Sequence, residues 1–151
     1  MADIQPLRLM ATDEDDLKIV SAAVQDAVAK AGGIRYRAKR RQFSIELNRF
    51  RWEDVSGRDV EPRRTRAILG IDGVNSVRAR GVSKSDPELI LSILTIAFEP
   101  GETEPAGTVR LTFAGDGEIA LAVECLDITL LDSDTVWATK SVPDHTHRGG
   151  R

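Results

Sequence analysis

Arginines recur in pairs, two positions apart, along the middle of the sequence. In a β-strand, residues two apart point to the same face, so each pair would present two guanidinium groups together. Guanidinium groups suit carboxylates and phosphates, because they donate paired hydrogen bonds. The same spacing is also found on ordinary solvated strand faces. The pattern predicts a face that binds an anionic ligand or partner, contributed by Arg49, Arg51, Arg64, Arg66, Arg78 and Arg80.

The turn signal at Asp72-Gly73 bears directly on this face. Asp-Gly between two alternating apolar segments is a strong hairpin signal, so we expect the strands before and after it to pair. In an ideal two-residue hairpin, Ala67 stands opposite Arg78. That register puts the 64/66 and 78/80 pairs on opposite faces unless a bulge intervenes. A single basic face therefore depends on the register of this hairpin.

Few side chains suit catalysis. His145 and His147 lie in a polar tail that supplies no framework for the three or four fixed ligands of a zinc site. Cys125 follows the apolar alternation of residues 119–123, so we expect it to be buried and unreactive. The glycine-rich loops that bind nucleotide phosphates are missing. The sequence indicates no catalytic residue, metal site or cofactor; it favours a non-enzyme without excluding an enzyme.

The bulk properties are those of an ordinary globular protein. The chain has 151 residues, of which 41% are hydrophobic and 30% charged, which suits one domain with a sizeable core. Its start resembles no signal peptide, and residues 89–98, the longest apolar stretch, are too short to span a bilayer. A single cysteine fits a reducing compartment. We expect a cytoplasmic protein with no membrane partner.

Charge is distributed unevenly along the chain. Residues 35–80 hold 13 Lys/Arg and 6 Asp/Glu, a balance of +7, whereas residues 81–151 hold 5 and 12, a balance of -7. This asymmetry indicates an anionic partner for the middle of the chain, or attraction between the two parts within the fold. Aromatic residues are few, which disfavours nucleic acid. The expected partner is a protein or a small anion; the oligomeric state is not determined.

One helix is expected near the N-terminus. Thr12 is in place to cap it, Asp15 follows three residues later, and acidic residues would lie on the positive end of the helix dipole. Apolar residues keep the helical period as far as Val24, and Gly32-Gly33 indicates a turn.

The remaining segments alternate as strands do. The apolar parity changes between Leu47 and Phe50, which predicts a bulge near Asn48. Residues 89–98 are rich in β-branched side chains, so we interpret them as a buried strand despite the helix-start signal before them. Residues 126–131 fit a bulged strand or a short helix equally well.

Two runs of the chain echo each other: each reads strand, long loop, strand, Asp-Gly, strand. They indicate either a decayed duplication or two meanders with the same turn chemistry. The predicted fold is α+β, an antiparallel meander that forms a curved sheet, half-barrel or sandwich with one helix. A pleckstrin-homology-like arrangement is the alternative if residues 126–131 are helical. The predicted organisation is one domain over residues 1–140 and a polar tail over residues 141–151.

Three stretches together resemble a known family. They are residues 24–28 (VQDAV), residues 47–53 (LNRFRWE) and residues 123–127 (VECLD), the last followed by Trp137-Ala138 and by residues 143–145 (PDH). In combination they resemble DUF2948, a domain of unknown function in bacterial and mostly alphaproteobacterial proteins. The resemblance would cover nearly the whole chain. It implies a cytoplasmic single domain and carries no mechanism with it.

The residues favour a non-catalytic binding or adaptor module whose basic strand face meets an anionic ligand or partner. Two alternatives stay open: a small enzyme that uses carboxylates and arginines in a pocket, and a structural subunit of a complex. A concave pocket lined by arginine and carboxylate would favour the enzyme, and a flat basic face would favour the adaptor.

Overall fold

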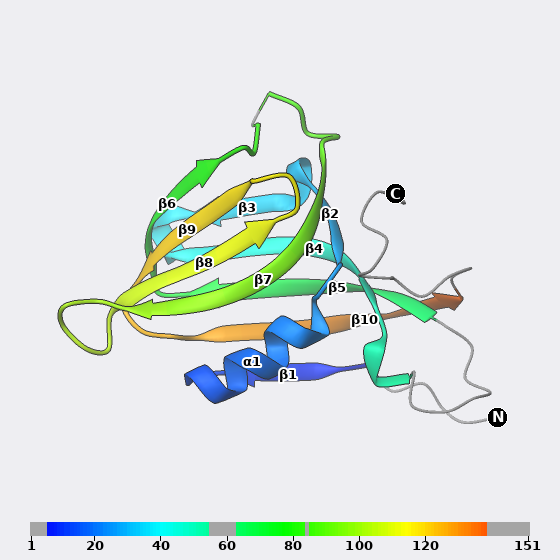
Figure 1. The fold of residues 1–151 in the computed structure, drawn as a ribbon, viewed down its shortest axis with the longest axis horizontal. Coiled ribbons are helices and arrows are strands. Elements are labelled where there is room, and N and C mark those ends of the chain that lie inside the picture. The colour runs from blue at the N-terminus through cyan, green and yellow to red at the C-terminus, as the bar shows by residue number, and fades with distance from the viewer. Residues whose placement is uncertain (1–5, 55–62, 84, 139–151) are drawn as a thin grey trace.

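The computed structural model describes residues 6–54, 63–83 and 85–138, which form one α-helix, three short 3-10 helices and ten strands (Figure 1). In chain order the elements are β1 (Arg8–Ala11), α1 (Glu14–Ala23), β2 (Val28–Lys30), η1 (Ala31–Gly33), β3 (Ile34–Arg37), η2 (Ala38–Arg40), β4 (Gln42–Phe50), η3 (Trp52–Asp54), β5 (Arg63–Asp72), β6 (Val74–Arg80), β7 (Ile90–Pro100), β8 (Gly107–Phe113), β9 (Glu118–Val123) and β10 (Ile128–Ala138).

All ten strands belong to one antiparallel sheet that curves round without closing. Its main path runs β1-β10-β5-β4-β2-β7-β8-β9-β6, and β3 pairs with β4 beside that path. Figure 1 shows β6 to β9 in front of β3, β4 and β5, so the sheet folds over its own apolar side. The predicted α+β curved sheet with one helix is confirmed.

Strand β6, at one end of this path, meets the β3–η2 segment at one point. The backbone N–H of Val74 donates to the carbonyl of Arg41 at 2.8 Å, and the Tyr36 hydroxyl donates to the carbonyl of Val74 at 2.8 Å. These bonds join the start of β6 to the end of the β3–η2 segment. No strand pairing links β3 and β6 elsewhere in the described part of the chain, so an open seam lies between them.

Helix α1 packs against β1 and β7 and buries Leu17 and Val20. Its N-cap is Asp13, whose side chain accepts the backbone N–H of Asp16 at 2.8 Å. The predicted cap, Thr12, lies one residue too early. A carboxylate in this position interacts with the helix dipole as well as the orphan N–H, which favours Asp13 over a neutral hydroxyl.

The two Asp-Gly signals have different outcomes. Around Asp116-Gly117 the hairpin forms between β8 and β9, with positive φ at Gly115 and Asp116. At Asp72-Gly73 the predicted hairpin is wrong: β6 pairs with β9 instead of β5. Both edges of β5 are already occupied, by β4 and β10, so the chain crosses to the other part of the sheet. The two echoing runs therefore differ in strand pairing.

The segments left ambiguous by the sequence are strands. Residues 90–100 form β7, as expected, and β10 begins at Ile128. The helical C-terminal segment required by the pleckstrin-homology-like alternative is absent from residues 126–138. Strand β9 ends at Val123, so Cys125 lies in the connection to β10 and is half-buried. The expectation of a buried Cys125 on the strand face is wrong. The tail over residues 141–151, with His145 and His147, lies outside the described residues.

Candidate functional site

Three of the six predicted site arginines are shielded from solvent. Arg49, Arg51 and Arg64 are buried, and the Arg49 side chain is fully enclosed. Strand β4 pairs with β5 from Gln42 to Phe50 without a register shift, so the predicted bulge near Asn48 is wrong. Arg49 therefore continues the same inner face as the apolar residues before it.

The parity change has another cause. Phe50 is buried at the end of β4 because Trp52 packs edge-on against it, with ring centroids 4.7 Å apart. The Trp52 indole N–H donates to the carbonyl of Gln25 at 3.1 Å, which fixes η3 against the end of α1. Both faces of β4 are thus covered at this end, one by the aromatic pair and the other by the packing round Arg49.

Arg49 is held by two carboxylates. Its Nε and Nη2 donate to the two Asp132 oxygens, each at 2.8 Å, and its Nη1 and Nη2 donate to the two Glu53 oxygens at 3.0 and 2.6 Å. A fifth bond, at 3.2 Å, runs from Nη1 to the carbonyl of Phe50. All five donors of the guanidinium are therefore used.

Asp132 is the centre of the same cluster. Its side chain is fully buried and also accepts the backbone N–H of Leu7 at 2.8 Å, and Arg51 Nη1 lies 3.5 Å from its Oδ2. The residue sits where the register of β10 on β5 shifts, between Asp132 and Val136. We call Arg49, Arg51, Glu53 and Asp132 the buried ion cluster; Glu53, with a side chain 32% exposed, is its solvent-facing member, and the formal charges sum to zero.

In the buried ion cluster the surroundings of Arg49 and Glu53 favour the charged forms of these two side chains. Burial lowers the pKa of Arg49, but its bonds to Asp132 and Glu53 outweigh this and raise it above the ordinary value. Burial likewise raises the pKa of Glu53, and the bond from Arg49 outweighs it, so that this pKa is lowered. A carboxylate held ionised and capped by arginine is a poor proton donor near neutral pH. We therefore interpret the buried ion cluster as a group that stabilises the fold.

Arg64 is committed to the fold in the same way. Its Nη1 donates to the side-chain and backbone oxygens of Asn48, at 3.0 and 3.2 Å. Arg64 stands opposite Phe50, two positions from Asn48, so these bonds run diagonally from β5 to β4.

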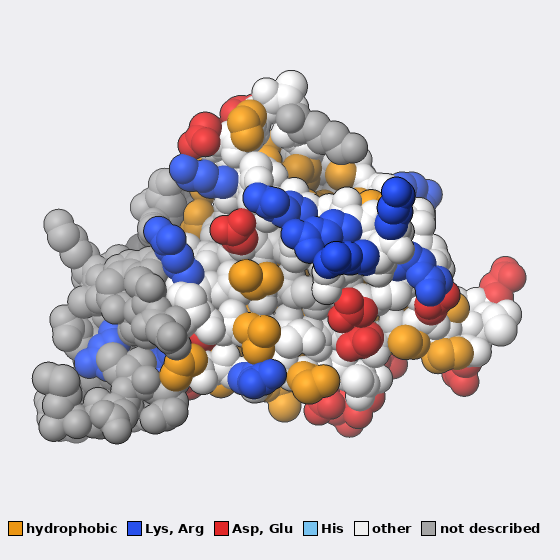
Figure 2. All heavy atoms as spheres, turned by 180° about the vertical axis from the view of Figure 1, so that it is seen from behind, with side chains coloured by type: hydrophobic (Ala, Val, Ile, Leu, Met, Phe, Trp, Pro, Cys, Tyr) orange, Lys and Arg blue, Asp and Glu red, His pale blue; other side chains and the backbone are white. Residues whose placement is uncertain are grey.

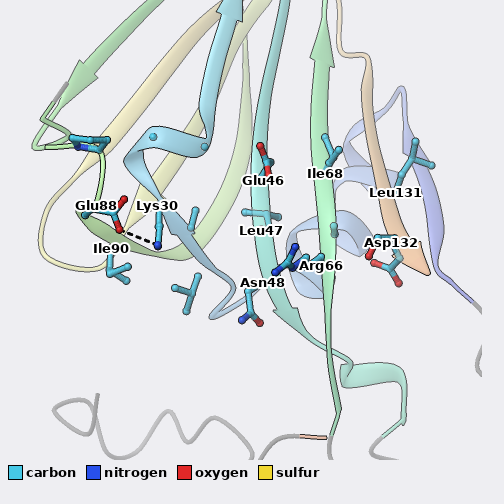
Figure 3. Close-up of a pocket in the computed structure, with 17 residues that line it drawn as sticks. Lys30, Glu46, Leu47, Asn48, Arg66, Ile68, Glu88, Ile90, Leu131 and Asp132 are labelled. Atoms are coloured by element: carbon cyan, nitrogen blue, oxygen red, sulfur yellow. Dashed lines mark hydrogen bonds and ion pairs between the residues drawn. The ribbon is translucent and has the colours of Figure 1, made fainter. Parts of the chain in front are cut away.

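Arg66 lies two positions from Arg64 on the same, outer face of β5, in a groove of about 840 Å³ on the outside of the sheet (Figure 3). Ile68, Ile90 and Leu131 line this groove and are 51%, 56% and 40% exposed, which is unusual for side chains of their size. Lys30 and Glu88 pair across its rim at 2.9 Å. We call this space the sheet groove.

The Arg66 side chain makes no hydrogen bond or ion pair with any described residue, and only its backbone is bonded. In Figure 3 it lies on the floor of the sheet groove with Asn48 and Glu46. The sheet groove thus combines an unpaired cation, a carboxylate and exposed apolar side chains.

Arg78 and Arg80 lie on the outer face of β6, opposite Ala120 and Glu118 of β9. Both are exposed, and Arg80 lies 3.5 Å from Glu118. They are not neighbours of the 64/66 pair, because β5 and β6 do not pair. The six predicted arginines therefore do not share one face.

A different basic surface replaces the predicted one. The β3–η2 segment exposes a run of basic residues and contacts the start of β6. We call this surface the basic rim; it consists of Arg35, Arg37, Lys39, Arg40, Arg41, Arg78 and Arg80. Figure 2 shows Lys and Arg side chains in a band across the back of the molecule. Only two members have a carboxylate partner among the described residues: Arg41 binds Glu124 and Arg80 lies near Glu118.

The sequence reasoning missed Asp132 and Lys30 as members of these sites. A signal for Asp132 was present: it follows Ile128 and Leu130 at the same parity, as Arg49 follows Leu47. A charge that continues a buried parity requires a buried opposite charge. No comparable signal marks Lys30, because the sheet groove depends on long-range pairing of β2, β4, β5 and β10.

The described residues contain no group of three or more His, Cys, Asp or Glu side chains placed to hold a metal ion. Among the same residues, no helix is long and apolar enough to cross a membrane.

These features define the class: an α+β protein with a curved, unclosed antiparallel sheet, a buried ion cluster and a basic rim. The chain belongs to the family described as "Protein of unknown function (DUF2948)", whose family model matches residues 7–145. The resemblance seen in the sequence is thereby confirmed. No curated protein and no solved structure matches the chain.

Proposed function

We propose that the protein is a binding module that holds an anionic partner protein on the basic rim. The observation that carries the proposal is the set of exposed basic side chains on β3, η2 and β6, most of them without a carboxylate partner among the described residues. Unpaired arginines on a strand surface repel each other, and an acidic partner relieves that repulsion.

Poly-L-glutamate is a suitable first probe. Labelled polymer binds with an affinity that falls as NaCl rises from 50 to 300 mM, because salt screens exposed charges. The double variant Arg78→Gln/Arg80→Gln binds about fivefold more weakly, since two exposed ion pairs contribute roughly 0.5 kcal/mol each. A matched control removes the same charge elsewhere, with Arg8→Gln on β1 and Lys18→Gln on α1, both exposed.

Two results would contradict this function. One is equal weakening by the test and control variants, which would indicate an effect of net charge alone. The other is tighter binding of a single-stranded oligonucleotide than of polyglutamate at equal charge, which would indicate a nucleic-acid site.

The sheet groove supports a second candidate, the binding of a small anionic ligand with an apolar part. The observation that favours it is the unpaired Arg66 beside three exposed apolar side chains. Titration with the fluorescent anion 8-anilinonaphthalene-1-sulfonate tests it. Arg66→Gln weakens this binding at least fivefold and Arg78→Gln leaves it unchanged; equal affinity in both variants would reject the candidate.

The sheet groove also bears on the enzyme alternative, because it contains arginine and carboxylate. Of its three carboxylates, however, Glu88 is paired with Lys30, Asp132 is held by Arg49, and Glu46 is exposed. No described histidine or cysteine lines the sheet groove. This arrangement supports ligand binding better than proton transfer.

A further inference from the structure

Strands β3 and β6 each have one edge without a partner strand among the described residues. β6 pairs only with β9, and β3 pairs only with β4. The bonds between Val74, Arg41 and Tyr36 join them at one end of the seam. Beyond that end each edge offers free backbone N–H and C=O groups, which is the condition for adding a further strand.

The two faces of β6 differ in chemistry. Val77, half-buried, and Ala79, exposed at the free edge, stand opposite the buried Leu121 and Ile119 of β9 and lie on the same face as these residues. Arg78 and Arg80 point to the outer face and are exposed. A strand that continues the sheet here would need apolar residues inside and acidic residues outside, in strict alternation.

Strand β3, across the seam, repeats the pattern. Ile34 and Tyr36 are half-buried and pair with the buried residues of β4, whereas Arg35 and Arg37 are exposed. A strand added to either edge of the seam would therefore need the same alternation of apolar and acidic residues.

The chemistry of β6 disfavours a second copy of this chain as the occupant. Antiparallel pairing of two β6 edges would bring Arg78 and Arg80 of one copy against those of the other. Like charges on neighbouring strands destabilise pairing. An acidic segment turns the same contact into attraction.

We infer that a partner protein adds an extended segment of alternating apolar and acidic residues to the free edge of β6. The inference rests on the proposed function, since Arg78 and Arg80 supply the charged contacts in both. Residues 76–80 lie beyond the joined end. They span about 17 Å at roughly 3.3 Å per residue, so the segment would be about five to seven residues long.

Two labelled peptides of identical composition separate strand addition from simple charge attraction. One alternates, Thr-Glu-Val-Glu-Val-Glu-Thr, and the other does not, Val-Val-Thr-Glu-Glu-Glu-Thr. The full chain binds the alternating peptide at least fivefold more tightly in fluorescence anisotropy. In ¹⁵N spectra the largest shifts fall on the amides of residues 76–80. Arg78→Gln/Arg80→Gln weakens binding, and the Arg8→Gln/Lys18→Gln control does not.

N-methylation shows whether a backbone edge is used. One alternating peptide is methylated on both valines and another on the first and last glutamates. An added strand bonds through only one of its edges, so one methylated peptide loses binding and the other keeps it. If all four peptides bind alike, strand addition is overturned and the proposed function stands. If no peptide binds and polyglutamate does not bind either, both are overturned.

Discussion

Replacing Arg49 tests whether the buried ion cluster stabilises the fold. Arg49→Met keeps a long, unbranched side chain and removes all five hydrogen bonds from the guanidinium. It leaves Asp132 fully buried with Leu7 N–H and the more distant Arg51 as partners. Breaking a buried ion pair costs roughly 3–5 kcal/mol, and the remaining partners place the expected loss at about 3 kcal/mol.

Urea unfolding followed by tryptophan fluorescence measures this loss. A loss of about 3 kcal/mol corresponds to a fall in Tm of about 6–12 °C for a chain of this size. Arg66→Met is the matched control: the same substitution on β5, at an exposed residue without a partner among the described residues, changes stability by about 0.5 kcal/mol or less.

A double variant shows whether the loss of stability in Arg49→Met comes from the uncompensated charge of Asp132. Arg49→Met combined with Asp132→Leu removes one buried charge of each sign and recovers at least about half of the lost stability, because the remaining buried Arg51 keeps Glu53 at 3.7 Å. The reasoning is refuted if Arg49→Met is as mild as Arg66→Met, or if the double variant is less stable than Arg49→Met alone.

Three further results are expected. Arg49 lowers the pKa of Glu53 in the folded protein. The Glu53 carboxylate therefore stabilises the fold at pH values above 4.5, its ordinary pKa, and this contribution is lost as the pH falls through the lower pKa of the folded state. The urea midpoint of Glu53→Gln should depend less on pH in this range than that of the wild type. Gly107→Ala should lower the free energy of unfolding in urea by about 2 kcal/mol, because a Cβ there would lie 2.4 Å from the Glu99 carbonyl oxygen. Gly70→Ala should be neutral or slightly stabilising, because nothing lies within 4 Å of a Cβ at that position. Asp13→Ala should lower stability by about 1 kcal/mol and Thr12→Ala by much less; the reverse order in thermal melts would contradict the observed cap.

The sequence predicted the elements better than their pairing. Strand β4 was recognisable because Phe43, Ile45 and Leu47 alternate with polar residues, a pattern that local chemistry produces on its own. The pairing of β6 was not, because it depends on whether β5 still has a free edge. That edge is taken by β10, more than 50 residues later in the chain. An Asp-Gly signal shows where the chain turns, but it does not show which strand edges are still free for pairing.

The arginines show the same limit at the level of a site. The spacing of two residues correctly predicts that Arg78 and Arg80 share one face of a strand. The same rule predicts a shared face for Arg49 and Arg51, but it does not show whether a face is exposed or buried. Only the location of Asp132 and Glu53 decides that the second pair lies inside. Residue type favoured the surface for every arginine, since buried arginines are rare without a partner.

The position of Asp132 in the sequence determines the order in which parts of the fold can form. Its partners Arg49 and Leu7 precede it by 83 and 125 residues, and β10 provides the neighbour on which both β1 and β5 depend. In a growing chain Arg49 can meet Glu53 early, but Asp132, and with it the strand that pairs with β1, arrives only when β10 has emerged. Contacts this distant in sequence also make folding slow relative to a helical protein of equal size. Strand β10 therefore completes two things at once, the backbone pairing of β1 and the set of partners of Arg49.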